Sequence, residues 1–337
     1  MCSNTITQRK PFNGSKSSTL DWLALFDNTC SYLPKQNKRK AQTVALNKRL
    51  LALDSDMSYS YKTTLFCASH YEVDEENKTK THYCKNRSCF TCIAIRKAYL
   101  INKYEGVLSE CQDLHFVTLT VKNVKGYALR KSVREMKLAF REIKRKALRM
   151  GLNADFLRSL EVTYNSEANT FHPHFHTLVD GEIEAEFLKS EWLKECSKHK
   201  KKKKGENTEL RYPNLIASSK GQDLKKADGG SSMELLKYLT KMEVKSEEDI
   251  KALDVIFTAL KGLRIVEPYG KFRTLNVDEE KAFENLQKQA VDASPGMYEW
   301  YQDVFEYVNK ETGECLIFKQ RKVDFSFKDV GEIVQRE

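Results

Sequence analysis

Histidines occupy three alternate positions in the stretch Phe171-His172-Pro173-His174-Phe175-His176-Thr177-Leu178-Val179. The intervening residues are mostly apolar or β-branched, a composition that favours a β-strand. Side chains alternate between the two faces of a strand, so the three histidines project to one face. Two neutral imidazoles on one rigid face can bind a divalent metal ion. The stretch therefore predicts a strand with a metal-binding face, and the alternative is ordinary histidines on a sheet surface.

A carboxylate is expected on the preceding strand, residues 157–165, which a short turn joins to the histidine strand. If that turn is symmetric, Glu161 lies opposite His174, whereas a slip by one residue would move the carboxylate to the other face. This register predicts a facial site made of Glu161, His174 and His176 with open coordination positions. Mixed nitrogen and oxygen ligation suits Mn²⁺ or Mg²⁺ bound to a phosphate oxygen. His172, at the strand's edge, is the third-ranked histidine.

A third strand, residues 115–121, and an amphipathic helix, residues 129–150, complete the predicted core. Gly151 is expected to end the helix. The apolar positions follow the 3.6-residue period of a helix: Leu129, Val133, Met136, Phe140, Ile143 and Ala147. The opposite face is basic, and it either touches phosphates or is simply solvated.

Four of the nine cysteines gather in one part of the chain, at Cys67, Cys84, Cys89 and Cys92. Four thiolates can close a tetrahedral zinc site and stabilise a segment without a large core. His70 or His82 could replace one of them. The alternatives are free or buried thiols, while a redox role is disfavoured because no thioredoxin-like pattern surrounds the cysteines.

Composition narrows the class of protein. The chain has 57 Lys and Arg against 47 Asp and Glu, a net charge of +10, which suits a polyanion such as nucleic acid. No apolar run approaches the roughly 20 residues that span a bilayer, and no signal sequence is recognisable. A cytoplasmic protein without a membrane partner is therefore expected, in which cysteines are metal ligands or free thiols. No phosphate-binding loop indicates a built-in ATPase.

The chain is expected to fall into four parts: a polar and helical start (1–60), a cysteine-rich zinc subdomain (61–105), a catalytic domain (106–245) and a helical, aromatic-rich C-terminal region (246–337). The last part would bind DNA or support oligomerisation. Its aromatic residues are expected in a helix against the core or a partner, with stacking on unpaired bases as the alternative: Tyr298, Trp300, Tyr301, Phe305 and Tyr307.

A second chemical motif is expected on a helix at residues 231–241, after two glycines and with a serine cap. Glu234 and Tyr238 are four residues apart and share a face, which Lys241 joins. A tyrosine can attack a phosphodiester covalently, and a neighbouring carboxylate can activate water. The alternative is a tyrosine with a purely structural role.

Together these motifs resemble the rolling-circle replication initiators of small bacterial plasmids with a single catalytic tyrosine, within the HUH endonuclease superfamily. The resemblance covers roughly residues 60–270 and runs in order through five motifs: Cys84-Lys85-Asn86-Arg87-Ser88-Cys89-Phe90-Thr91-Cys92, Phe116-Val117-Thr118-Leu119-Thr120, Leu160-Glu161-Val162-Thr163-Tyr164-Asn165, His172-Pro173-His174-Phe175-His176 and Glu234-Leu235-Leu236-Lys237-Tyr238.

The resemblance implies a role for each matching residue. His174 and His176 would be the metal ligands, with Glu161 as the third. Tyr238 would attack the scissile phosphate and stay linked to the 5′ end, so that the freed 3′ hydroxyl primes synthesis. Glu234 would activate water for the terminating cleavage. The family's cysteine positions match Cys67, Cys84, Cys89 and Cys92.

The chain also departs from the family pattern. Phe90 stands where the family often has Pro, and His172 stands where it often has Asn or Ala. A lysine-rich run, which includes Lys200-Lys201-Lys202-Lys203-Lys204, looks like an insertion. This run would either hold the DNA backbone electrostatically or form a solvated loop.

The expected fold is α+β: an HUH core with a small antiparallel sheet and packed helices, a zinc-binding N-terminal subdomain and a helical C-terminal region. The expected function is metal-dependent, sequence-specific nicking and strand transfer at a plasmid origin through a 5′-phosphotyrosine intermediate. Expected partners are single-stranded or hairpin origin DNA and the host helicase and DNA polymerase, with self-association left open. The alternatives are a single-tyrosine HUH transposase or relaxase, and a non-cleaving, zinc-stabilised DNA-binding regulator of copy number.

Overall fold

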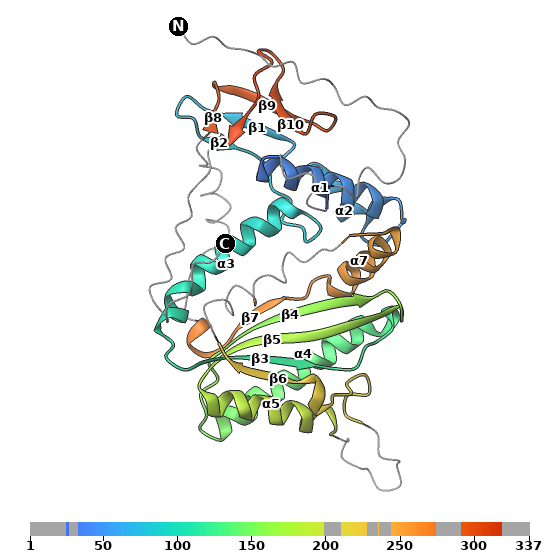
Figure 1. Ribbon diagram of the computed structural model, residues 1–337, viewed down its shortest axis with the longest axis vertical. Helices are drawn as coiled ribbons and strands as arrows, with labels where there is room; N and C mark the ends of the chain where they lie inside the picture. The colour runs from blue at the N-terminus through green and yellow to red at the C-terminus, as the bar shows by residue number, and fades with distance from the viewer. Residues whose placement is uncertain are drawn as a thin grey trace, which may run out of the picture.

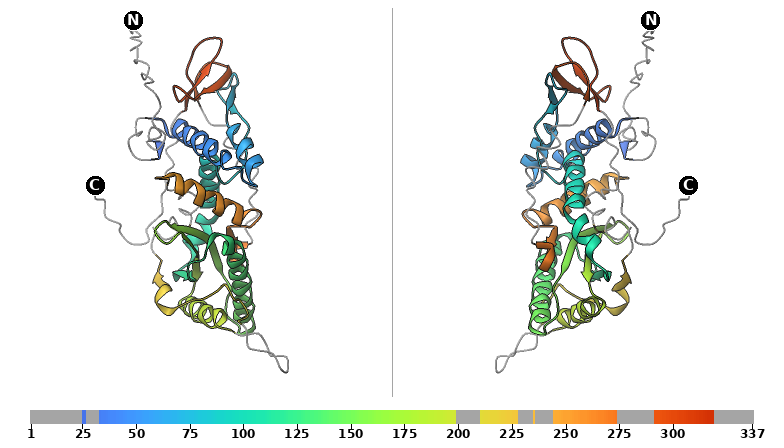
Figure 2. Two further views of the ribbon diagram at one scale, coloured as in Figure 1. Left: turned by 90° about the vertical axis from the view of Figure 1, so that its right-hand side faces the viewer. Right: turned by 90° about the vertical axis from the view of Figure 1, so that its left-hand side faces the viewer.

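The protein is an elongated α+β molecule in a computed structural model (Figures 1 and 2). A five-stranded sheet lies at one end, a smaller sheet lies at the other, and helices separate them (Figure 1). No helix in the described segments is long and apolar enough to cross a membrane. The structure describes residues 25–26, 33–198, 210–227, 235, 244–273 and 291–318.

The larger sheet is antiparallel throughout and has the strand order β6-β3-β5-β4-β7. Its strands are β3 (Leu114–Thr120), β4 (Phe156–Asn165), β5 (Thr170–Asp180), β6 (Asp223–Lys226) and β7 (Val266–Pro268). The three strands expected from the sequence are β3, β4 and β5, each within a residue or two of its expected bounds. The antiparallel sheet of the expected fold is therefore confirmed.

Helices α4 (Gly126–Arg149) and α5 (Glu182–Cys196) cover one face of this sheet (Figures 1 and 2). All six apolar positions expected on the inner face of α4 are at most 2% exposed. Phe140 of α4 packs against Phe156 and Phe175 of the sheet, and Trp192 of α5 packs against Phe175. Gly151, with φ +75°, follows the end of α4 as the sequence predicted. This apolar layer fixes the position of β4 and β5.

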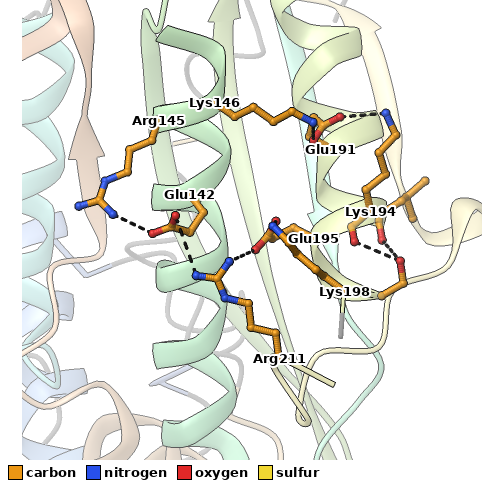
Figure 3. A network of polar contacts seen from close by, with 10 residues as sticks. Glu142, Arg145, Lys146, Glu191, Lys194, Glu195, Lys198 and Arg211 are labelled. Carbon is orange, nitrogen blue, oxygen red and sulfur yellow. Dashed lines mark hydrogen bonds and ion pairs between the residues drawn. The ribbon is translucent and has the colours of Figure 1, made fainter. Parts of the chain in front are cut away.

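Ion pairs join the outer surfaces of α4 and α5 (Figure 3). Lys146 of α4 binds Glu191 of α5 at 2.6 Å. Arg211, from the segment after α5, binds Glu195 of α5 at 3.0 Å, and its backbone N–H donates to the carbonyl of Lys198 at 2.7 Å. The two described ends that flank the lysine-rich run are thereby held together on α5.

The opposite face of the sheet packs against α3 (Phe90–Glu110). Phe116, Leu157 and Leu178 of the sheet share a buried cluster with Tyr104 of α3 and with Leu235. Helix α7 (Glu247–Leu260) begins with the Ser246 side chain accepting from the N–H of Asp249, an N-cap. It crosses between the two sheets beside α3 (Figure 1). Helix α3 therefore lies on the face that Glu161 shares, while α7 also contacts α4 at the edge of the sheet.

A cysteine-rich unit forms the other end of the molecule (Figure 1). Its four-stranded antiparallel sheet has the order β10-β9-β1-β2. The elements of this end are α1 (Lys35–Leu51), α2 (Ser58–Leu65), β1 (His70–Val73), β2 (Thr79–Lys80), β8 (Val291–Asp292), β9 (Gly296–Tyr301), β10 (Glu306–Asn309) and β11 (Ile317–Phe318).

The expectation that the C-terminal aromatic residues lie in a helix is wrong. Tyr298 and Trp300 belong to β9, and Tyr307 belongs to β10. Aromatic residues at alternate positions suit a strand, and β1 offers a partner edge on which Tyr71 stands opposite Tyr298. Within the described part of the C-terminal region, α7 is the α-helix, so the helical description holds only there. The four-part division by residue number stays a prediction.

Candidate active site

Two neighbouring strands bring together a carboxylate and two histidines. Glu161 of β4 stands opposite His174 of β5, the register that a symmetric turn predicts. Its Oε2 lies 2.7 Å from Nε2 of His174 and 3.1 Å from Nε2 of His176. All three residues are only 6% exposed. The alternation of each strand therefore gathers the three side chains on one face, as the sequence predicted.

The outer nitrogen of each histidine also has a partner. Nδ1 of His176 lies 3.3 Å from the hydroxyl of Thr118 on β3, and Nδ1 of His174 lies 3.1 Å from the carbonyl of His172. A carbonyl only accepts, so a proton on Nδ1 of His174 satisfies this contact, and Nε2 would offer its lone pair when a metal ion takes the place of its hydrogen bond to Glu161. A ring nitrogen with such a lone pair is the usual metal ligand, and the partner on the other side sets the orientation of the ring.

The pKa values of Glu161 and His172 favour the binding of a cation at the triad. Burial disfavours the charged carboxylate of Glu161, but hydrogen bonds from His174 and His176 outweigh burial and hold its pKa below the usual value. Burial, reinforced by the neighbouring His174, lowers the pKa of His172. Glu161 is thus ionised at neutral pH, as a metal ligand must be.

The donor set fits a divalent ion. One ligand atom from each of Glu161, His174 and His176 lies within 4.8 Å of the others. Two imidazoles and one carboxylate on a single face leave coordination positions for substrate and water. The ring of His172 stacks on His174 at 5.0 Å between centroids, but His172 is not part of this group. Its third rank among the histidines agrees with this geometry.

The four cysteines of the predicted zinc site also come together. Sγ of Cys67 lies 3.5 Å from Sγ of Cys89 and of Cys92, and Cys84 lies 3.7 Å from Cys92. A disulfide would require about 2.05 Å, and the seven cysteines within the described segments are all free. A tetrahedron with Zn–S bonds of about 2.3 Å has edges of about 3.8 Å between sulfurs. The cluster could therefore hold a zinc ion with little rearrangement.

Backbone N–H groups and a buried cation surround this cluster. The N–H groups of Cys84 and Lys85 donate to the sulfurs of Cys67 and Cys92, each at 3.3 Å. Lys40, 1% exposed, donates to the carbonyl of Cys67 at 2.6 Å. Burial lowers the pKa of Lys40 to about 8, opposed by negative charge at the cysteines. Such donors and a cation stabilise the excess negative charge of four thiolates.

The two spare histidines do not join this cluster. His70 and His82 are both exposed, and the metal-binding group among the described residues contains the four cysteines alone. Two residues that contact these sites, Lys40 at the cysteines and Thr118 at His176, were not predicted from the sequence. For Thr118 a signal exists, because it lies in β3 at the position that pairs with His176. Lys40 belongs to a lysine-rich helix and carries no such signal.

Several predicted residues lie outside the described segments: Glu234, Tyr238, Lys241 and the run Lys200–Lys204. Leu235 is described, and it is fully buried in the cluster with Phe116, Leu157 and Leu178. Phe116 in turn packs against His176, with 5.2 Å between ring centroids. Leu235 itself therefore packs on the face of the sheet that carries the triad.

Comparison with known families supports a role in replication. A family model described as replication protein matches residues 76–312, which is more than half of the chain. This match contains the three cysteines of the Cys84–Cys92 motif and the whole Glu161, His174 and His176 group. No solved structure matches the chain significantly.

Several curated bacterial relatives are each named protein rep. One from Bacillus amyloliquefaciens is 34% identical over 128 residues, covering 34% of this chain and 37% of the relative. One from a Bacillus species is 31% identical over 148 residues, covering 38% and 47%. One from Lentilactobacillus hilgardii is 25% identical over 248 residues, covering 66% and 73%. The chain thus spans less than half the length of the two Bacillus relatives.

Proposed function

Since this protein belongs to the replication protein family, we propose that it is a plasmid rolling-circle replication initiator and that it nicks one strand of its origin. The cut would be metal-dependent and sequence-specific, and it would leave the 5′ end covalently attached to Tyr238. The observation that carries the proposal is the buried group of Glu161, His174 and His176, which has ligand atoms within 4.8 Å of one another.

Glu161, His174 and His176 would hold a divalent ion, Mn²⁺ or Mg²⁺. When bound, such an ion polarises a phosphoryl oxygen and stabilises the charge that develops during displacement. Thr118 and the carbonyl of His172 orient the two imidazoles, as their contacts at 3.3 and 3.1 Å indicate. The burial of the triad limits competing water and strengthens each electrostatic interaction.

Tyr238 is the proposed nucleophile. Its phenolic oxygen would form a bond to the scissile phosphorus, the bond to the 3′ oxygen would break, and that oxygen would leave with a proton as a free 3′ hydroxyl. The phosphodiester energy is kept in the phosphotyrosine, so the step can reverse without ATP. Connectivity supports the assignment, because Tyr238 follows the buried Leu235 by three residues and so cannot be more than about 11 Å of chain away from it.

Glu234 and Lys241 complete the proposed catalytic set. Glu234 would accept a proton from the water that ends the final round of replication. Lys241 would place positive charge beside the developing phosphate charge. A single tyrosine then suffices, because a carboxylate and water replace a second nucleophile.

The cysteine cluster would hold a structural zinc ion. Its four sulfurs are close to the spacing of a zinc tetrahedron. The proposed partners are origin DNA in a single-stranded or hairpin form, and the host's helicase and DNA polymerase. We place this activity in the bacterial cytoplasm, where the plasmid is replicated.

The covalent intermediate tests the proposal. Purified protein is mixed with Mn²⁺ and supercoiled DNA of its own replicon, and linked protein is mapped by mass spectrometry. We expect an adduct on Tyr238 that disappears in Tyr238→Phe, in His174→Ala and in the presence of a chelator. Tyr127→Phe is the matched control, because Tyr127 is 92% exposed on α4.

Three outcomes would overturn the proposal. Nicking that persists in Tyr238→Phe would assign the chemistry to another residue. Tight binding to the origin without any nicking would favour the non-cleaving regulator of copy number. Nicking at a mobile element's end or a transfer origin in place of a replication origin would favour the transposase or relaxase.

A further inference from the structure

A cleft of about 630 Å³ opens beside Glu161, on the face of the sheet that carries the triad. Residues of α3, of α7 and of the neighbouring parts of β4 and β7 line it, and Figure 1 shows where these elements lie in the fold. Pockets for small organic groups typically measure about 300–1,000 Å³. The cleft is therefore large enough for one or two nucleotides and too small for a double helix.

The lining of this cleft has two parts. The apolar part of the lining includes Ile93, Val162 and Ile265. The charged lining comprises one carboxylate, Glu161, and five cations: Lys85, Arg87, Arg96, Lys103 and Arg264. An apolar interior with an excess of cations matches a base with its flanking phosphates.

The wall of the cleft is held in place by its own cations. Arg87, just before the N-terminus of α3, donates hydrogen bonds to the carbonyls of Leu260, at 2.6 Å, and Leu263. These bonds join the start of α3 to the turn after α7. Lys103 lies 5.5 Å from the ring centroid of Tyr99 and 5.8 Å from that of Tyr104. These contacts preorganise the wall and so reduce the entropy lost on binding.

The turn between α7 and β7 is open to solvent. Gly262 adopts φ +73°, a conformation that favours glycine, and an added Cβ would meet no atom within 4 Å. The neighbouring Arg264 is exposed, while its carbonyl accepts from Lys137 at 3.0 Å. A fixed backbone thus presents a solvent-facing guanidinium at the mouth of the cleft, where it can reach a phosphate.

We propose that this cleft binds unpaired DNA next to the scissile phosphate, with a base in the apolar interior and flanking phosphates on Lys103 and Arg264. The inference rests on the proposed function, because Glu161 belongs both to the cleft lining and to the triad. Through Glu161, a nucleotide in the cleft would direct its neighbouring phosphate toward the metal ligands. Unpaired DNA would be favoured over duplex because only an unpaired base can enter.

Binding of a labelled oligonucleotide tests this assignment. A short fluorescein-labelled oligothymidylate, and a duplex of equal length, are titrated against the Tyr238→Phe protein by anisotropy over a range of salt concentrations. Arg264→Glu should weaken single-strand binding and reduce the slope of log affinity against log salt by about 0.7 or more, the effect of losing a phosphate contact. Arg264→Lys should restore most of both.

The matched control is Arg134→Glu, which makes the same charge change at an exposed position on α4, on the opposite side of the sheet. It should leave the slope unchanged. Photocrosslinking with a bromodeoxyuridine-substituted oligonucleotide should label peptides of α3 or residues 260–266. The inference is overturned if Arg134→Glu and Arg264→Glu act equally, if crosslinks map only to α4 or to the β9–β10 hairpin, or if the Arg264-dependent binding prefers duplex.

The nicking activity and the binding of DNA in the cleft can be refuted independently of each other. The binding measurements need neither the metal nor the tyrosine, so crosslinks in the cleft together with no nicking would refute the nickase alone. Nicking on Tyr238 together with DNA binding that does not depend on Arg264 would refute only the proposal that the cleft binds DNA. The cleft would then suit a protein partner.

Discussion

Thr118→Val should weaken metal binding at the triad while leaving every ligand in place. Thr118 contacts Nδ1 of His176 at 3.3 Å, and valine keeps the shape of threonine without its hydroxyl. Losing such a supporting contact typically costs 10–100-fold in metal affinity. Because 3.3 Å is slightly longer than an ordinary hydrogen bond, we expect the lower end, a rise of about tenfold in the Kd for Mn²⁺, or about 1.4 kcal/mol.

Ser159 provides the matched control. On the other neighbouring strand, Ser159 stands opposite His176 just as Thr118 does, but its buried hydroxyl contacts no polar group. Ser159→Ala should therefore leave Mn²⁺ affinity unchanged. Free Mn²⁺ can be followed by electron paramagnetic resonance during titration, and Trp192 fluorescence checks that the core is intact. Equal affinities of Thr118→Val and the parent protein, or equal losses in both variants, would refute the role given to Thr118.

Three further perturbations test the scaffold. Glu267→Gln should lower the free energy of unfolding by about 3 kcal/mol, because it leaves Arg158, a 1% exposed cation that binds Glu267 at 2.7 Å, without its charged partner. Arg158→Met removes the buried cation itself and should cost less. Equal losses of the two variants in urea denaturation would contradict this reasoning. Burial raises the pKa of Glu267, but Arg158 and Lys137 outweigh it and the pKa is lowered. The stabilisation is therefore complete above the ordinary carboxyl pKa of about 4.3 and is lost as the pH falls through the lowered value, where variant and parent should converge. Cys89→Ser should reduce zinc from about one ion per chain to well below one, measured by atomic emission after gentle purification, and a parent protein without zinc would refute the closed site. Leu235→Ala removes a fully buried side chain and should cost about 2–5 kcal/mol locally, reducing nicking while Mn²⁺ affinity holds; unchanged nicking would show that this anchor is dispensable.

The face that carries Glu161, His174 and His176 could be predicted from the sequence because the signals that determine it are local. Strand alternation and one short turn determine where Glu161 stands relative to His174, and both signals lie within a single hairpin. The buried face of α4 could also be predicted from its amphipathic pattern, because all six apolar positions of that pattern are buried. The cysteine cluster could be predicted because three of its four members lie within nine residues, a spacing that is typical of metal sites.

Other features depend on contacts that no local pattern records. The aromatic residues around Tyr298 were expected in a helix, because nothing near them in the sequence reveals that β1 offers a free edge. Arg158 falls in a stretch expected to be a half-buried strand, yet its guanidinium lies 4.3 and 4.1 Å from the rings of Phe140 and Phe175. The basic cleft likewise unites residues of α3 with Arg264, far apart along the chain.

The pairing of β1 with β9 has a consequence for synthesis on the ribosome. Tyr307 donates to the carbonyl of Ala68 across a separation of 239 residues. At about 5–20 residues per second, the ribosome needs about 10–50 s to make that intervening chain. The four clustered cysteines thus emerge first, and the sheet that packs against them is completed last. During this interval the thiols lack the cover of that sheet, and the zinc ion proposed for the cluster would protect them from oxidation.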